Sequence, residues 1–142
     1  MEERTSRTPE ISLEDTFLIA TAGIHEEDVR AAVVAEALGH LQQGFDAHYA
    51  GSGVTDDDIL VGDNSYALAV ETIARLDEPR FVTVASRMIR DGAGLIAGGG
   101  AVSLKTWTPH LAGLLDIISD EGEERSEARI EEAAEELRRR SG

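Results

Sequence analysis

The feature that most constrains this chain is the apolar run of residues 57–76, DDILVGDNSYALAVETIARL, which opens with a helix signal. Thr55 precedes three aspartates, and Asp58 stands where a capping box places its acid, so a helix is predicted from Thr55 to Leu76. Apolar side chains fall on more than one face of it: Ile59, Tyr66, Val70 and Ile73 on one, and Leu60, Val61, Leu68 and Ala69 on others. Such a helix is expected to be buried between neighbours rather than laid on a surface.

Gly62 and Asp63 interrupt this run. A glycine inside a helix costs about 1 kcal/mol relative to alanine, so its predicted use is the close approach of another backbone. A carboxylate in an apolar helix must find hydrogen-bond donors or shift its pKa. Asp63 is therefore expected to hold two core helices in register by accepting hydrogen bonds, the alternative being a half-exposed helix residue.

The rest of the chain also predicts helices, and no sustained strand alternation is present. The fold class is therefore all-α, a helical bundle. Its predicted organisation is a flexible N-terminus (residues 1–10), a helical core (11–119) and an acidic C-terminal helix or tail (120–142). Start and stop signals place the helices at about 13–22, from near His25 to 49–53, 55–76, 78–89 or beyond, 108–119 and 126–140.

Three helix boundaries depend on particular residues. Asp77 before Pro79 predicts a cap with proline in the first turn, and Thr108-Pro109 predicts the same. The glycine-rich stretch 92–100 lacks the lysine and hydroxyl residue of a P-loop, so it is interpreted as a helix end and a flexible connector.

The last predicted helix carries a thin apolar seam of Ile130, Ala133, Ala134 and Leu137. It is interpreted as a solvated helix, loosely docked or partly disordered, with a partner-binding helix as the alternative.

The charge balance excludes several classes of partner. The net charge is −15, with Lys105 as the one lysine among thirteen basic residues and with 28 acidic residues. Such a chain repels nucleic acid and anionic membrane surfaces. It fits a protein that works in concentrated salt, as in an extreme halophile, although an acidic mesophilic protein has the same signature. With no cysteine, no signal peptide and no membrane span in the sequence, a cytoplasmic protein is expected.

Residue patterns for catalysis are weak. Asp56, Asp57 and Asp58 point about 100° apart on a helix, so capping explains them better than a shared metal ion. Glu36 and His40 share a helix face, and with Asp46 they define one alternative, a small metal-dependent enzyme. No Gly-x-Ser-x-Gly elbow occurs. We therefore predict no catalytic residue, no metal ligand and no cofactor bound by this chain.

Two segments resemble a known family. Residues 59–63 (ILVGD) followed by 66–69 (YALA) resemble the helix after the first aspartate-rich motif of trans-polyprenyl diphosphate synthases. Residues 35–48 resemble the preceding family helix, particularly in the small, non-catalytic subunits of two-component synthases. The likeness covers about residues 29–97 and implies that the bundle is part of the isoprenoid synthase fold.

The resemblance also implies what this chain lacks. In the family, the junction at 46–53 carries aspartates for magnesium and arginines for diphosphate, but here one aspartate remains and no arginine follows. The stretch 92–100 likewise lacks the family's glycine–glutamate or glycine–glutamine. The implied role is a non-catalytic subunit whose catalytic partner holds Mg²⁺, while this chain completes the product tunnel and helps to set chain length.

Residues for the interface or the tunnel follow from the same likeness: Phe45, Gly62, Asp63, Tyr66, Ala67, Ala69 and Val70. The expected partner is a catalytic synthase subunit or a second copy of this chain, giving a dimer. The alternative is a self-associating helical protein of the same descent without prenyltransferase activity.

Overall fold

The computed structural model describes residues 12–22, 29–48, 55–98 and 103–141. These ranges form helices and contain no β-strand, which confirms the all-α class. The helices are α1 (Leu13–Thr21), α2 (Val29–His48), α3 (Asp56–Ala74), α4 (Pro79–Ala97), α5 (Leu104–Ser119) and α6 (Glu123–Ser141). The predicted flexible N-terminus at 1–10, the helix start near His25 and the loop at 49–53 lie outside the described residues.

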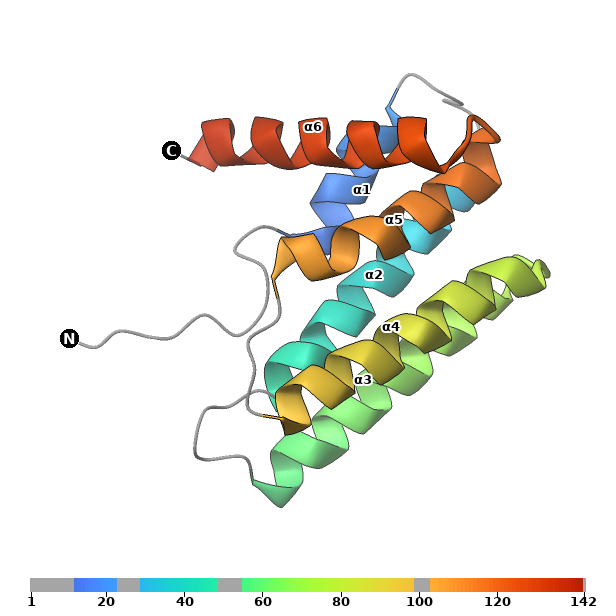
Figure 1. Ribbon diagram of the computed structural model, residues 1–142. Helices are drawn as coiled ribbons and strands as arrows, with labels where there is room; N and C mark the ends of the chain where they lie inside the picture. Colours follow the sequence, from blue (N-terminus) through green and yellow to red (C-terminus); the bar gives the residue numbers. More distant parts are fainter. Residues whose placement is uncertain (1–11, 23–28, 49–54, 99–102, 142) are drawn as a thin grey trace.

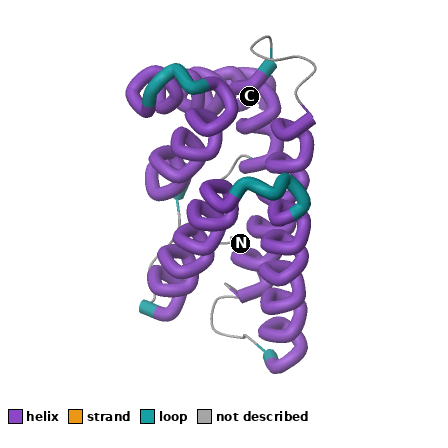
Figure 2. Tube along the Cα trace, turned by 90° about the vertical axis from the view of Figure 1, so that its right-hand side faces the viewer, coloured by secondary structure: helices purple, strands orange, loops and turns teal. Residues whose placement is uncertain are grey.

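The helices form a bundle with one helix laid across its end. α3 and α4 run antiparallel along the lower edge in Figure 1, and α2 lies behind them and packs along most of α3. α6 crosses above the others and contacts α1 and α5. The view turned by 90° shows the same side-by-side arrangement of the lower helices (Figure 2). α3 therefore lies at the edge of the bundle.

The core is built mainly from aliphatic side chains and a few large rings. Trp107, Phe17, Phe45 and Phe81 are each fully buried, and they come from four different helices. Full burial of a side chain of this size contributes roughly 1.5–3 kcal/mol. These four aromatic residues thus lie where the helices meet.

α1 and α3 both begin with a side-chain cap, and the one predicted for α3 is confirmed. The Ser12 hydroxyl accepts from the Asp15 N–H at 3.0 Å. At α3, the Thr55 hydroxyl accepts from the Asp58 N–H at 3.1 Å, and the Asp58 carboxylate accepts from the Thr55 N–H at 3.0 Å. This reciprocal pair is a capping box, so the start of α3 is fixed by local sequence.

The cap of α4 is not the predicted Asp77. That residue adopts φ 56°, the left-handed conformation, and completes the turn after α3. The cap is Glu78, whose carboxylate accepts from the Arg80 N–H at 3.2 Å, and Pro79 opens the helix. The prediction was wrong by one residue because aspartate tolerates the left-handed conformation that this tight turn requires.

α4 continues to Ala97, through part of the stretch predicted as a connector. Gly92 is buried within this last part of the helix, where a side chain would collide with the rings of Phe45 and Trp107. This glycine therefore serves helix packing rather than chain flexibility. Residues 99–100 of the predicted connector lie outside the described residues.

α5 begins at Leu104, four residues before the predicted start. Thr108 does not cap it, and its hydroxyl instead donates to the Leu104 carbonyl at 3.0 Å. Pro109 lies inside the helix, where it removes one backbone hydrogen bond. The added turn places the buried Trp107 in the core, and this burial offsets the missing hydrogen bond.

α6 is docked more firmly than the loosely docked interpretation supposed. Ile130, Ala133 and Ala134 are buried, and Leu137 is half-buried, so the predicted apolar seam faces α1 and α5. The helix also begins earlier than predicted, at Glu123. Among the described helices, none is both long enough and apolar enough to cross a membrane.

Candidate functional site

The candidate site is α3 together with the side chains that it contacts. Its inner side, which faces α2, consists of buried residues spaced for one helical face: Gly62, Ser65, Ala69, Thr72 and Ile73. Its outer side faces away from the bundle. The two sides differ in packing and are described in turn.

A row of aromatic rings lies against the inner side. Phe45 of α2 stacks on Trp107 of α5, with ring centroids 4.7 Å apart and planes 15° from parallel. Phe45 also contacts Tyr66 of α3 at 5.5 Å, and Tyr66 meets the ring of His48 edge-on at 5.0 Å. At the far end, His110 lies 6.0 Å from Trp107. The row links α2, α3 and α5 through offset and edge-on ring contacts, which aromatic side chains favour.

Three glycines make room for these rings. A Cβ added at Gly44 would lie 2.4 Å from Tyr66 Cε1, and one at Gly62 would lie 2.2 Å from His48 Nε2. At Gly92, an added Cβ would lie 2.5 Å from Phe45 Cε1. Gly62 therefore allows close approach, but the nearest group is the His48 imidazole and not the backbone that the sequence analysis expected.

Each end of the row is a histidine paired with an aspartate. His48 Nε2 lies 3.2 Å from the Ile59 carbonyl oxygen and 3.4 Å from Asp63 Oδ1. His110 Nε2 lies 3.0 Å from Asp91 Oδ2. These contacts join the end of α2 to the start of α3, and α4 to α5.

Asp63 combines the two interpretations of its role. Its side chain is 63% exposed, so it is not a carboxylate enclosed by apolar groups. It nevertheless lies 3.4 Å from His48 Nε2 of α2, so it contacts a second helix, although not as a carboxylate enclosed by hydrogen-bond donors. The Asp63 carboxylate contacts the His48 imidazole at the exposed edge of the interface between α2 and α3.

The Tyr66 hydroxyl is buried and has no hydrogen-bond partner among the described residues. Its burial raises the pKa of the phenol, and the nearby charge of Asp63 raises it further. The phenol is therefore neutral at physiological pH and is a poor candidate for a catalytic base. The Tyr66 ring is part of the aromatic row, and its hydroxyl forms no hydrogen bond with the described residues.

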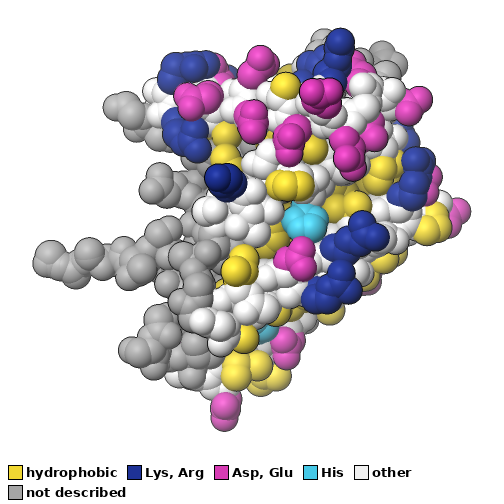
Figure 3. Space-filling view, in the orientation of Figure 1, with side chains coloured by type: hydrophobic (Ala, Val, Ile, Leu, Met, Phe, Trp, Pro, Cys, Tyr) yellow, Lys and Arg dark blue, Asp and Glu magenta, His cyan; other side chains and the backbone are white. Residues whose placement is uncertain are grey.

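The outer side of α3 exposes large apolar side chains. Leu60 is 65% exposed and Val61 is 55% exposed, and Ile59 and Leu68 are also exposed. Figure 3 shows hydrophobic side chains at the surface of the lower edge, where α3 lies. The prediction of a helix buried between neighbours is thus wrong for this chain alone, because α2 and α4 leave the outer side of α3 uncovered.

The predicted interface or tunnel residues divide between these two sides. Phe45 and Ala69 are fully buried, Gly62 is buried, and Tyr66 is half-buried with them on the inner side. Asp63 and Ala67 are exposed, and Val70 is half-buried between the two sides. The structure therefore brings four of the seven together inside the chain.

Sequence reasoning missed the second half of the aromatic row. Trp107, His110 and Asp91 were not singled out, and neither were Gly44 and Gly92 as contact positions. The signals were the single tryptophan and Gly44, which stands inside a predicted helix, where glycine is costly unless something approaches it.

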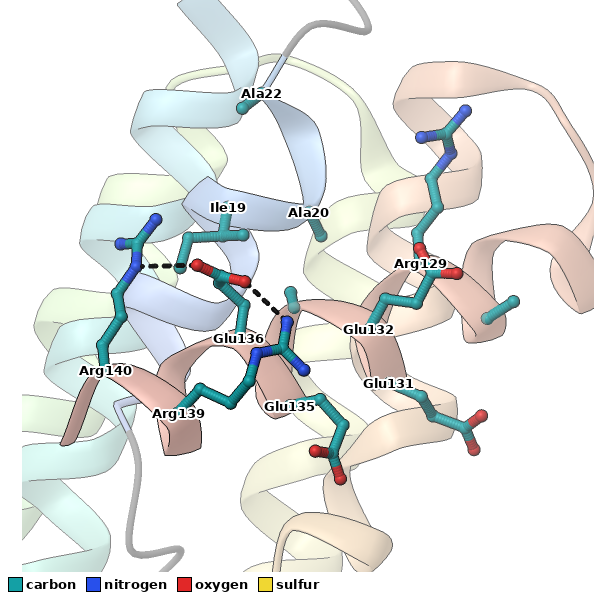
Figure 4. Close-up of a pocket in the computed structure, with 12 residues that line it drawn as sticks. Ile19, Ala20, Ala22, Arg129, Glu131, Glu132, Glu135, Glu136, Arg139 and Arg140 are labelled. Carbon is teal, nitrogen blue, oxygen red and sulfur yellow. Dashed lines mark hydrogen bonds and ion pairs between the residues drawn. The ribbon is translucent and has the colours of Figure 1, made fainter. Parts of the chain in front are cut away.

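A groove of about 710 Å³ lies between α1 and α6 (Figure 4). Ile19 and Ala20 of α1 form part of its apolar floor, and charged residues of α6 form its rim. On that rim Glu136 accepts from Arg139 at 2.7 Å and from Arg140 at 3.1 Å. Hydrogen bonds from the two arginines, that of Arg139 first, lower the pKa of Glu136. These three rim charges are therefore paired within α6 itself.

A smaller hollow of about 300 Å³ contains the residues of the metal-enzyme alternative. Glu36, His40 and Asp46 all line it, and His40 Nε2 lies 3.9 Å from Glu36 Oε2. Within the described ranges, no three His, Asp or Glu side chains lie close enough together to hold a metal ion.

Comparison of the chain with protein-family models, with curated proteins and with solved structures gives no match.

Proposed function

We propose that this chain is a non-catalytic subunit of a long-chain polyprenyl diphosphate synthase, in which it completes the product tunnel and helps to set chain length. The observation that carries the proposal is the exposed apolar outer side of α3. The same helix holds residues 59–69, on which the resemblance to these synthases rests. Sequence likeness and surface character thus coincide on one helix.

Exposed apolar surface on this helix favours a partner on energetic grounds. Burial of apolar area contributes about 25 cal/mol per Å², so covering Leu60 and Val61 stabilises a complex. In the isolated chain, Leu60 and Val61 stay largely exposed to water, because no described helix covers them. Contiguous exposed apolar patches on soluble proteins commonly mark interaction sites.

In the proposed complex, the aromatic row fills the inner side of α3, so a long prenyl chain would run along the outer side, between the two subunits. Ala67 is small and exposed there, and Val70 borders it. A larger residue at position 67 would narrow the space. The catalytic subunit would hold Mg²⁺ and bind both diphosphates.

The test is co-expression with the long-chain synthase encoded in the same genome, followed by co-purification and analysis of product length. We expect a stable complex, and we expect Leu60→Glu with Val61→Glu to abolish it. Val29→Glu is the matched control, because Val29 is 72% exposed on α2, away from this face. Ala67→Leu should shorten the products. Failure to co-purify, or product lengths that are the same with and without this chain, would contradict the proposal.

A second candidate function, a self-associating helical protein without a role in prenyl transfer, is favoured by the same exposed side of α3. The two functions differ in what covers that side. A homodimer that persists in the presence of the synthase supports the second candidate, and exchange into a mixed complex supports the first.

A further inference from the structure

The exposed side of α3 forms one continuous stripe. Its members recur every three or four residues, which places them on one side of a helix, and all of them are exposed. We call this set the outer stripe: Asp57, Leu60, Val61, Asn64, Ala67, Leu68, Glu71 and Arg75. It is about 27 Å long at 1.5 Å per residue.

The outer stripe is symmetric about Asn64. Leu60 and Leu68 lie four residues before and after it, and Val61 and Ala67 lie three residues before and after it. When two such helices cross antiparallel at Asn64, each leucine faces a leucine of the second copy, and each valine faces an alanine. This is the self-complementary pattern that a two-fold symmetric interface requires. The small Ala67 side chain allows the two helices to approach closely.

Asn64 itself suits the two-fold axis. A side-chain amide has both donors and an acceptor, so two asparagines that meet on the axis can hydrogen-bond to each other. One polar residue within an apolar seam fixes the register of paired helices. Asn64 is the polar member of the stripe between Leu60 and Leu68.

The two ends of the stripe carry charges of opposite sign. Asp57 lies at the beginning, and Arg75 lies at the end. Among the described residues, neither side chain forms a hydrogen bond or an ion pair. Antiparallel pairing brings Asp57 beside Glu71 of the second copy. Helical side chains lean toward the N-terminus, so Arg75 of that copy reaches back between the two carboxylates.

We infer that, when no catalytic partner is present, two copies of this chain pair through the outer stripe, with α3 antiparallel to α3 and Asn64 on the two-fold axis. Each copy carries a net charge of −15, so long-range repulsion opposes the pairing at low salt. The distance over which charges repel each other falls from about 10 Å at 0.1 M salt to about 3 Å at 1 M salt, so the dimer becomes more stable as salt is added. The inference does not rest on the identity of the synthase.

The first experiment places one thiol on the axis. The chain contains no cysteine, so Asn64→Cys gives a protein with a single reactive thiol. We expect a short bis-maleimide to cross-link the full-length variant into a dimer in roughly 1 M salt, and less so in about 0.1 M salt. Val29→Cys, on the exposed start of α2, is the control and should remain monomeric after the same treatment. Equal cross-linking of both variants, or none at Asn64→Cys, would overturn the inference.

The second experiment measures association of uncross-linked variants by sedimentation equilibrium. Leu60→Glu should weaken dimerisation by roughly tenfold or more, because two added charges then enter the apolar seam. Arg75→Glu should weaken it roughly three- to tenfold, and Asp57→Arg in the same chain should recover much of that loss. Circular dichroism checks that each variant keeps its helix content. A wild type that stays monomeric at every salt concentration, or a dimer that tolerates Leu60→Glu, would refute the pairing and leave the co-purification test with the synthase unaffected.

Discussion

α3 and α6 have the same length but opposite surface character. Each is 19 residues long, and α6 is by far the more polar of the two. The few apolar residues of α6 are nevertheless buried, as Ile130 and Ala133 illustrate. α3 has more apolar residues, and it leaves Leu60, Val61 and Leu68 exposed.

The difference shows that exposure on α3 does not come from a bundle that packs poorly. The chain buries even the thin seam of its most charged helix, and it covers the inner side of α3 with a row of rings. The stability of the single chain therefore does not depend on the outer side of α3. Residues there should matter for association, and residues on α6 and on the inner side of α3 should matter for folding.

The largest effect should come from the seam of α6. Ile130→Ala removes a fully buried side chain and should lower the free energy of unfolding by about 2–5 kcal/mol, through lost burial and an unfilled cavity. Urea denaturation followed by circular dichroism measures this loss. Glu131→Ala, at an exposed neighbour, should stay within about 0.5 kcal/mol of wild type. A loss below about 1 kcal/mol for Ile130→Ala would mean that α6 is held only loosely.

A smaller effect is expected where α2 meets the inner side of α3. At Gly44, an added Cβ would lie 2.4 Å from the Tyr66 ring and 3.2 Å from the Gly62 carbonyl oxygen. Gly44→Ala should therefore destabilise by about 1–2 kcal/mol, because crowding exceeds the gain in helix propensity.

The matched control is Gly94→Ala in α4, where an added Cβ meets nothing within 4 Å. This variant should gain about 0.5–1 kcal/mol from helix propensity alone. If both glycine variants change stability in the same direction, the space around Gly44 is not as crowded as described.

A still smaller effect is expected for the outer side itself. In dilute solution, where the chain is monomeric, Leu60→Ser should change the free energy of unfolding by less than about 0.5 kcal/mol, because the side chain is already exposed. At high concentration the wild type should gain stability through association, and the variant should not. Melting temperatures measured over a range of protein concentrations separate the two regimes. A large loss in the dilute variant would show that Leu60 supports the fold.

The smallest effect concerns Tyr66 and appears only at alkaline pH. Its pKa is raised in the folded chain, so the folded state keeps a proton that the unfolded state loses above about pH 10. This contribution to stability is complete below about pH 10 and disappears as pH rises through the folded pKa.

Tyr66→Phe should match or slightly exceed the wild type near neutral pH, because it removes an unpaired buried hydroxyl. Between about pH 9 and 11 its stability should fall less steeply than that of the wild type. Urea midpoints across this range provide the measurement. Parallel pH profiles would show that the hydroxyl is solvated.

The helices themselves were largely predictable from local sequence. The capping box of Thr55 and Asp58 and the Ser12 cap depend on residues within one turn, so the sequence alone identifies them. The predicted helix boundaries were wrong where tertiary packing outweighed local signals. Pro109 is inside α5 because Trp107, two residues earlier, is buried in the core.

The candidate site was only half predictable. Gly62 stood out because a glycine inside a helix is costly, and Tyr66 stood out because it lies in the segment that resembles the polyprenyl synthases. Nothing in the linear pattern could show that Trp107, far along the chain, stacks on Phe45. The exposure of Leu60 was also not foreseeable, because helix periodicity identifies apolar faces but not which of them a neighbour covers. The polyprenyl synthase role and the halophilic setting stay predictions.

The packing of Trp107 also gives the protein a built-in optical reporter. It is the single tryptophan of the chain, it is fully buried, and it stacks on Phe45 with His110 nearby. Its emission therefore monitors one place, the contact between α2 and α5, without any dye. Substitutions on the far side of α3 should leave its wavelength unchanged, and any red shift would signal that water has reached the interior.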